Sequence, residues 1–199
     1  MGIALSCSHF LCSIIFYISM GCLKPFVFYF LLLIQLPINA QEAEKVESQE
    51  FDNMYKVSQT LYRSEQPSKK GFGVIDSMEI RTILSLRNRV SDRFRARKSQ
   101  VQLERLRINS WRMTYDDIVS ALIIIRDAEK PVLVHCLHGS DRTGAIVAAY
   151  RMAFDGWSKE EAINEFLEEK YGYHEKWFPD ILNLLKELDI DRLKTELNK

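Results

Sequence analysis

One short segment brings together residue types that could carry out a reaction. The run Val132–Met152, VLVHCLHGSDRTGAIVAAYRM, contains Cys136 and, six residues later, Arg142. A cysteine thiolate is a strong nucleophile, and a guanidinium can hold two oxygens of an oxyanion at once. Gly139, between them, allows the backbone to turn its N–H groups inward. These residues indicate a site where a bound phosphate meets a thiolate.

The elements on either side of Cys136 explain how these groups could act together. Val132–His135 is predicted to be a short buried strand, and a helical pattern begins near Arg142. Cys136 would then lie between the carboxyl end of a strand and the start of a helix, where open α/β sheets bind ligands. The free N–H groups and partial positive charge of a helix N-terminus bind anions and stabilise a thiolate. A thiolate beneath a bound phosphate is placed for in-line attack on phosphorus.

Neighbouring residues could assist this reaction. Thr143 could donate its hydroxyl to the sulfur and ease the departure of the thiolate, and His135 could orient Cys136 from the end of the strand. The loop between Cys136 and Arg142 is expected to bind the substrate through Leu137, His138, Gly139 and Ser140.

The same residues were considered as a zinc site. His135, Cys136 and His138 are close in the sequence, but only His9 and His174 remain as further histidines and no cysteine follows. This ligand count argues against a metal. No metal or organic cofactor is expected, because the thiolate and the arginine would do the work of a metal.

The decapeptide HCLHGSDRTG resembles the signature of the Cys-dependent tyrosine and dual-specificity phosphatase superfamily, which is His-Cys, five residues, Arg, then Ser or Thr. Approximately the segment Tyr55–Leu188 is consistent with the compact dual-specificity core of that family. The upstream segments LYRSEQPS and RTILSLRNR also look like the opening of small bacterial and plant-fungal atypical members. The fixed positions of the signature are all present, as His135, Cys136, Gly139, Arg142, Thr143 and Gly144.

The resemblance implies a phosphomonoesterase that works through a cysteinyl-phosphate intermediate. Its substrates would be phosphotyrosine, phosphoinositides or soluble inositol phosphates. One alternative is a non-catalytic phosphate-binding pseudophosphatase, although such proteins usually lose the Cys or the Arg. Another is a sulfur or arsenate enzyme with a similar loop, for which resolving cysteines would be useful.

The proton donor for the leaving group is open. The family usually takes an Asp from a mobile loop upstream of the Cys, but RINSWRMTYDDI contains no Trp-Pro-Asp. Asp116 and Asp117 fall in the first turn of a predicted helix, where acidic residues are expected for dipole reasons alone. Asp141, directly before Arg142, resembles the arrangement in myotubularin-like phosphatases. We favour Asp141 as the donor, the alternative being that it only pairs with a basic neighbour.

A basic run precedes the site. The segment Arg87–Arg107 holds eight basic residues against Asp92 and Glu104. Such a run is either a solvated surface or a rim that steers polyanionic substrates towards the pocket. Arg87, at the end of a predicted strand, is the member expected to reach the substrate.

The first 40 residues have a different composition from the rest. Lys24 is the only charged residue among them, and two apolar runs, Phe10–Met20 and Phe26–Leu36, are each too short to span a bilayer comfortably. The second run, with Lys24 before it and Ala40 in the PINAQE that follows, is typical of a secretory signal. We expect export to the periplasm or outside after cleavage near Ala40, with Met20 as the true start. The alternative is an uncleaved membrane anchor.

Signal removal would leave a single cysteine. Cys7, Cys12 and Cys22 all lie in the first 40 residues, so only Cys136 would remain. A lone thiol cannot form an internal disulfide, and in an exported protein it is a liability unless it has a function. The alternative is an inert, buried cysteine.

The length of 199 residues and the zero net charge are those of one ordinary domain with no nucleic-acid partner indicated. Membrane proximity would come only through the N-terminus.

A flexible lead-in (41–54) should precede the catalytic domain (55–199). Strand, helix, strand and then successive helices predict an α/β, compact dual-specificity-phosphatase-like fold. In it, a short, mostly parallel sheet is flanked by helices, and the Cys-x5-Arg phosphate loop joins a strand to a helix. Strands are expected within Tyr55–Ser64, Arg81–Arg87, Val101–Ile108 and Val132–His135, and helices within Ser68–Met78, Thr114–Ala128, Arg142–Gly156, Ser158–Tyr171 and Phe178–Leu193.

Overall fold

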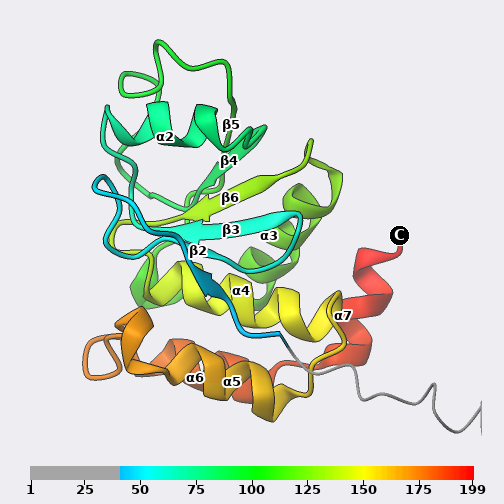
Figure 1. Cartoon of the computed structure of the whole chain (residues 1–199). Coiled ribbons are helices and arrows are strands. Elements are labelled where there is room, and N and C mark those ends of the chain that lie inside the picture. The colour runs from blue at the N-terminus through cyan, green and yellow to red at the C-terminus, as the bar shows by residue number, and fades with distance from the viewer. Residues whose placement is uncertain (1–40) are drawn as a thin grey trace, which may run out of the picture. The chain divides into compact units, whose positions relative to one another are not determined.

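The computed structural model describes residues 41–199 (Figure 1), and the predicted signal segment (1–40) lies outside the described residues. The strands are β1 Glu44–Lys45, β2 Tyr55–Lys56, β3 Leu61–Ser64, β4 Thr82–Ser85, β5 Gln102–Arg105 and β6 Val132–His135. The α-helices are α2 Gly71–Ser77, α3 Tyr115–Asp127, α4 Asp141–Ala153, α5 Lys159–Leu167, α6 Pro179–Glu187 and α7 Ile190–Leu197. Two short 3-10 helices are η1 Ser110–Arg112 and η2 Glu169–Tyr171.

The strands form one sheet in the order β1-β2-β3-β6-β4-β5. Strands β3, β6, β4 and β5 are parallel, whereas β1 and β2 are antiparallel to their neighbours. Strand β6 lies in the middle, and His135 at its end is in register with Ser64 on β3 and with Ser85 on β4. All four residues of β6 are buried, which is the pattern of a central parallel strand. The predicted α/β fold with a mostly parallel sheet is confirmed.

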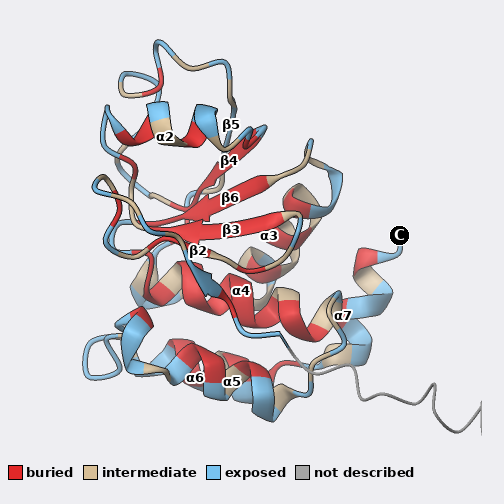
Figure 2. Cartoon of the chain, in the orientation of Figure 1, coloured by how far each residue is buried: buried red, intermediate tan, exposed pale blue. Residues whose placement is uncertain are grey.

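Helices cover both faces of the sheet. Figure 1 shows α2 on one face and α3 and α4 on the other, with α5 and α6 beyond α4. The larger hydrophobic core lies between the sheet, α3, α4 and the C-terminal helices, and a smaller one lies under α2. Helix α4 is buried along most of its length (Figure 2), as expected for a helix between two layers. The start of α4 is therefore firmly placed against the end of β6.

Local signals in the sequence set several helix boundaries. Thr114 and Asp117 form the predicted capping box at the start of α3, and Ser158 and Glu161 form the one at α5. The single helix predicted over 178–193 is wrong. The chain breaks between α6 and α7, where the side chain of Asp189 accepts a hydrogen bond from the backbone N–H of Arg192 and caps α7.

The segment 41–54, expected to be a flexible lead-in, is instead packed on the domain. Phe51 and Met54 are buried in the smaller core, and Ala43 is buried against the larger one. Residues Glu44–Lys45 pair with β2 as the edge strand. The apolar residues of this segment are few and not periodic, so their burial could not be predicted from a local pattern. The folded domain thus begins before residue 55.

The described elements lie in one compact unit, Ala40–Lys199. The six strands and both hydrophobic cores are made from residues between Ala43 and Leu197. Among residues 41–199, no helix has the length and apolar character needed to cross a membrane. A protein that starts at Gln41 therefore contains everything from which the described fold is built.

Candidate active site

The loop after β6 turns tightly against the end of β3. Cys136 follows directly on the strand and is buried, and α4 begins at Asp141. Gly139 has φ 76°, and a Cβ there would lie 2.6 Å from backbone atoms of Ser64 and Glu65. Only glycine combines this backbone conformation with this close approach. The predicted strand, Cys-x5-Arg loop and helix are all present.

Arg142 is held at the base of this loop by backbone carbonyls from two other segments. Its Nη1 donates to the carbonyl oxygen of Leu86 at 3.1 Å and to that of Ile108 at 3.3 Å. Its Nε is buried and finds no hydrogen-bond partner among the described residues, and the same holds for Thr143 Oγ1. Buried donors without acceptors are costly, so their presence on one loop calls for an acceptor. An oxyanion bound in the loop would supply one for Arg142 Nε.

Both ring nitrogens of His135 contact oxygen atoms. Its Nε2 lies 3.1 Å from Asp92 Oδ2, and its Nδ1 lies 2.9 Å from the carbonyl oxygen of Cys136. A carboxylate and a carbonyl are both acceptors, so each ring nitrogen of His135 lies within hydrogen-bonding distance of an oxygen. Burial alone would raise the pKa of Asp92, but the hydrogen bond and charge of His135, helped by Gln66, lower that pKa to about 2. The backbone of Cys136 is thus in contact with a buried His135–Asp92 pair.

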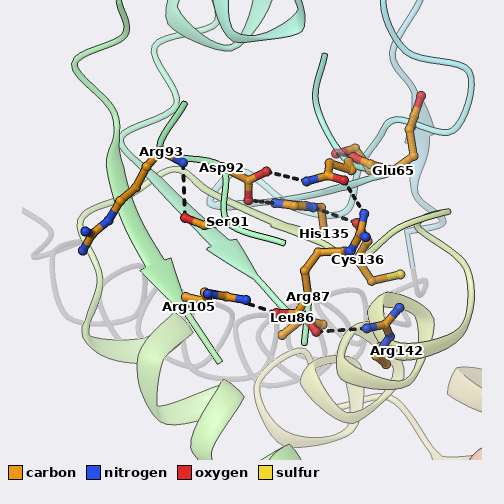
Figure 3. Close-up of polar contacts among 12 residues, drawn as sticks. Glu65, Leu86, Arg87, Ser91, Asp92, Arg93, Arg105, His135, Cys136 and Arg142 are labelled. Carbon is orange, nitrogen blue, oxygen red and sulfur yellow. Dashed lines mark hydrogen bonds and ion pairs between the residues drawn. The ribbon is translucent and has the colours of Figure 1, made fainter. Parts of the chain in front are cut away.

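The Asp92 carboxylate is part of a longer chain of contacts (Figure 3). Gln66 Nε2 donates to Asp92 Oδ1 at 2.7 Å, and Arg87 Nη1 donates to Gln66 Oε1. Burial first, and then the nearby charge of Arg142, lower the pKa of Arg87, while Asp92 and Cys136 act in the opposite direction. Figure 3 shows Arg87 near Cys136 and Arg142, and its contact with the substrate stays a prediction.

A second arginine lies under the loop. Arg63 on β3 is almost fully buried, and its Nη2 donates to the carbonyl oxygen of Gly139 at 2.8 Å. Its guanidinium stacks 4.1 Å from the ring centre of Tyr171. Burial lowers the pKa of Arg63, and the charges of Tyr171, Glu165 and Cys136 counteract this effect. A positive charge next to Cys136 thus comes from a strand residue that the sequence analysis did not single out.

Other loop residues are braced from segments distant in the sequence. Asn53 Nδ2 donates to the carbonyl oxygen of His138 at 2.8 Å, so the segment before β2 supports the loop. The backbone N–H of Gln66 donates to the carbonyl of Leu137, whose side chain is exposed. Ser140 is buried directly before α4. These contacts hold the loop backbone, whose N–H groups would bind a phosphate.

The three aspartates that could donate a proton to the leaving group have different surroundings. Asp117 is engaged in the capping box of α3, and Asp116 is exposed on the same helical turn. Asp141 is buried at the first position of α4. Its Oδ1 accepts from the backbone N–H of His174 at 3.0 Å and lies 3.0 Å from His174 Nδ1. Asp141 does pair with a basic neighbour, and that neighbour is a histidine from the turn after η2.

The basic run lies beside the site. Arg105 donates to the carbonyl oxygens of Arg87 and Asn88, which fixes the start of the loop between β4 and β5. A cavity of about 460 Å³ opens next to this loop. Its walls include the buried Asp92 and a group of basic side chains, Arg93, Arg105 and Arg107. Part of the basic run is therefore a wall of a hollow next to the Asp92–His135 pair, while residues such as Arg97 and Lys98 are exposed on the surface.

Sequence reasoning missed the residues that support the loop from elsewhere in the chain. Asp92 was counted only as a minor charge in a basic run, and Asn53 fell in the expected lead-in. Arg63 lay in a strand-like segment, and the segment LYRSEQPS, which was noted as a resemblance, was the signal that could have identified it. His174 had no motif around it. All four act through tertiary contacts, and for Asp92, Asn53 and His174 no local pattern reveals them.

Comparison with known proteins agrees with this architecture. The model of the tyrosine phosphatase family matches residues 49–195. The dual specificity protein phosphatase TpbA of Pseudomonas aeruginosa strain UCBPP-PA14 is 31% identical over 144 residues, which are 71% of this chain and 65% of TpbA. The inositol diphosphatase DSP5 of Arabidopsis thaliana is 27% identical over 153 residues, which are 71% of this chain and 72% of DSP5.

Solved structures show the same fold. The crystal structure of P. aeruginosa TpbA superposes with a TM-score of 0.73 at 28% identity and covers 82% of this chain and 100% of that one. The catalytic core of the PP-IP phosphatase SIW14 from S. cerevisiae superposes with a TM-score of 0.65 at 19% identity, covering 75% and 93%. The chain spans a little less than two thirds of the length of the TpbA sequences that it matches. Since the family model matches well over half of the chain, this protein belongs to the tyrosine phosphatase family.

Proposed function

We propose that the protein hydrolyses phosphate monoesters through a cysteinyl-phosphate intermediate. The observation that carries this proposal is the convergence of three groups on one loop. Cys136 begins the loop between β6 and α4, and Arg142 Nε and Thr143 Oγ1 are buried donors without partners among residues 41–199. A phosphoryl group in the loop would accept from Arg142 and from the loop N–H groups, and the sulfur would accept from Thr143.

In the first step, the Cys136 sulfur attacks phosphorus, the bond from phosphorus to the leaving oxygen breaks, and that oxygen takes up a proton. In the second step, water attacks the phosphocysteine, the sulfur–phosphorus bond breaks, and inorganic phosphate leaves. Thr143 donates to the departing sulfur, and His135 keeps the Cys136 backbone in place. Arg142 and the loop amides stabilise the charge on the three other phosphoryl oxygens in both steps.

We propose Asp141 as the group that gives the proton in the first step and takes one from water in the second. Asp141 is favoured because it lies directly before Arg142. The competing residue Asp117 is already engaged in the capping box of α3. Asp141→Asn and Asp116→Asn would be compared on aryl phosphates with good and poor leaving groups. The donor variant should lose most activity on poor leaving groups. Equal losses on both kinds of substrate in both variants would reject both residues.

For the substrate, we propose a phosphorylated protein or an inositol phosphate. Support comes from the relatives, which include a dual specificity protein phosphatase and an inositol diphosphatase. A Cys-to-Ser form of TpbA was crystallised in complex with pTyr. The basic wall of the neighbouring cavity would suit a substrate with several negative charges.

The experiment is hydrolysis of an aryl phosphate by purified 41–199 protein in the presence of EDTA. Turnover is expected in the wild type and should be abolished in Cys136→Ser, which should still bind the substrate. Activity that survives in Cys136→Ser would disprove the mechanism. Binding without turnover in the wild-type protein would instead identify a phosphate-binding module.

We also propose that the first 40 residues direct export and are removed near Ala40, on the basis of their apolar composition, Lys24 and the small residue at the boundary. N-terminal sequencing of the exported protein should begin near Gln41. Recovery of only the full-length, membrane-bound chain would refute cleavage.

A further inference from the structure

We propose that His138, Asp141 and His174 form a binding site for a late first-row divalent metal ion such as Zn²⁺, next to the phosphate loop. Each residue offers one ligand atom, and the three atoms all lie within 4.8 Å of one another. His138 and Asp141 belong to the loop, whereas His174 comes from the turn between η2 and α6. Ligand counting in the sequence argued against a metal, because it did not include Asp141 and no local pattern places His174 beside the loop.

The distances suit a zinc ion. With bonds to nitrogen and oxygen of about 2.0–2.2 Å, neighbouring ligand atoms in a tetrahedral site lie about 3.3–3.6 Å apart. His174 Nδ1 is already 3.0 and 3.2 Å from the two carboxylate oxygens of Asp141. The rings of His138 and His174 have their centres 5.4 Å apart. Rotation of the exposed His138 side chain would bring its ligand nitrogen to a similar distance from the ligand atoms of Asp141 and His174.

The backbone around these ligands is held in place. Asp141 is the first residue of α4 and is buried, and the backbone N–H of His174 donates to its carboxylate. The backbone N–H groups of Trp177 and Phe178 both donate to the carbonyl of His174, which closes the turn. The carbonyl of His138 accepts from Asn53. Two exposed imidazoles over one buried carboxylate thus form a preorganised site that remains open to solvent.

The ligand chemistry selects the ion. Imidazole nitrogens favour Zn²⁺, Ni²⁺ and Cu²⁺, whereas Mg²⁺ and Ca²⁺ prefer sites made only of oxygen. Three protein ligands leave a fourth position for water.

The binding test uses 41–199 protein with Cys136→Ser, so that the thiol cannot act as a ligand. Zn²⁺ would be titrated by calorimetry and by competition with a chromophoric chelator, and Co²⁺ by its visible absorption. One equivalent should bind at micromolar or lower concentration, and millimolar Mg²⁺ should not displace it. His174→Ala should weaken binding by about tenfold or more. Glu175→Gln, the exposed neighbour on the same turn, is the matched control and should bind as the parent does.

Two results would overturn the site: no saturable binding in the parent, or equal affinity in the parent and in His174→Ala. If His174→Ala fails to fold by circular dichroism, His138→Ala takes its place with the same expectation. The Cys136→Ser protein needs no turnover for these measurements, so a failure of the proposed phosphatase reaction leaves the binding result intact. Conversely, an active phosphatase that binds no Zn²⁺ would reject only the metal site.

Discussion

Asp92 and His135 are buried partners, with Asp92 Oδ2 3.1 Å from His135 Nε2, and this contact connects the loop between β4 and β5 to the backbone of Cys136. The two residues are 43 positions apart in the sequence. The Asp92 carboxylate orients the His135 ring, whose Nδ1 lies 2.9 Å from the carbonyl oxygen of Cys136. Asp92 thus acts as a positioning residue in the proposed reaction.

Replacement of Asp92 by Asn should remove the charge that holds His135. The substitution should cost about 2 kcal/mol of unfolding free energy, because a buried hydrogen bond to a charged carboxylate is lost. Since the loop backbone would shift slightly, kcat on an aryl phosphate should fall on the order of tenfold or more. Urea denaturation and steady-state kinetics measure the two effects. Glu104→Gln, which removes an exposed acid from the same basic run, is the control. A variant with parental stability and kcat would contradict the assigned role.

The same pair predicts a pH dependence of stability. The pKa of Asp92 is about 2 in the folded protein, against an ordinary value of 3.8. A lowered pKa means that the stabilisation is fully present above about pH 4 and is lost as the pH falls through 2. The shift corresponds to about 2 kcal/mol. The difference in unfolding free energy between the wild type and Asp92→Asn should therefore shrink by about this amount between pH 5 and pH 2. A difference independent of pH would show that the carboxylate charge does not stabilise the fold.

Alanine substitutions at Gly139 and Gly156 distinguish the effect of backbone strain from the effect of a steric clash. Both have positive φ, 76° and 74°, but only at Gly139 would a Cβ meet other atoms within 4 Å. Gly156→Ala should cost about 1–2 kcal/mol of stability and leave turnover unchanged. Gly139→Ala should in addition displace the loop and lower kcat/KM on the order of a hundredfold. Thermal denaturation and aryl phosphate kinetics compare the two variants, and equal activity in both would mean that the loop tolerates the displacement.

The basic wall of the cavity predicts selectivity among substrates. Arg93→Gln combined with Arg107→Gln should raise KM for an inositol polyphosphate about fivefold or more, since each exposed charge contact contributes up to about 1 kcal/mol. KM for a simple aryl phosphate should stay within about twofold, because Arg142 and the loop bind its single phosphate. Arg81→Gln, an exposed arginine just before β4, is the control. Equal changes in KM for both substrates would assign these arginines to general steering only.

The centre of the site could be predicted because its signals are local. The strand, Cys136, the glycine, Arg142 and the following helix lie within about twenty consecutive residues, and a capping box is contained in four. The mostly parallel sheet followed from the order of these local patterns. Arg87 lies just after the buried strand β4, and that it reaches the substrate stays a prediction.

The other features of the site and fold could not be predicted, because they depend on contacts between segments that are distant in the sequence. Asp92 lies in a polar loop without periodicity, so its burial against His135 has no sequence signature. His174 reaches Asp141 only because η2 ends in Gly172, which has φ 69° and turns the chain back. The break between α6 and α7 at Leu188 and Asp189 interrupts an apolar pattern that continues through it, so periodicity alone indicated one helix.

The most direct test of the account is to trap the intermediate on Cys136. The 41–199 protein would be mixed with an aryl phosphate, quenched in acid during turnover, and digested for peptide mass spectrometry. We predict a phosphoryl group on the peptide that contains Cys136, and its absence from the Cys136→Ser protein. Continued turnover with no phosphoryl group on that peptide, or with the group on another residue, would contradict the central claim.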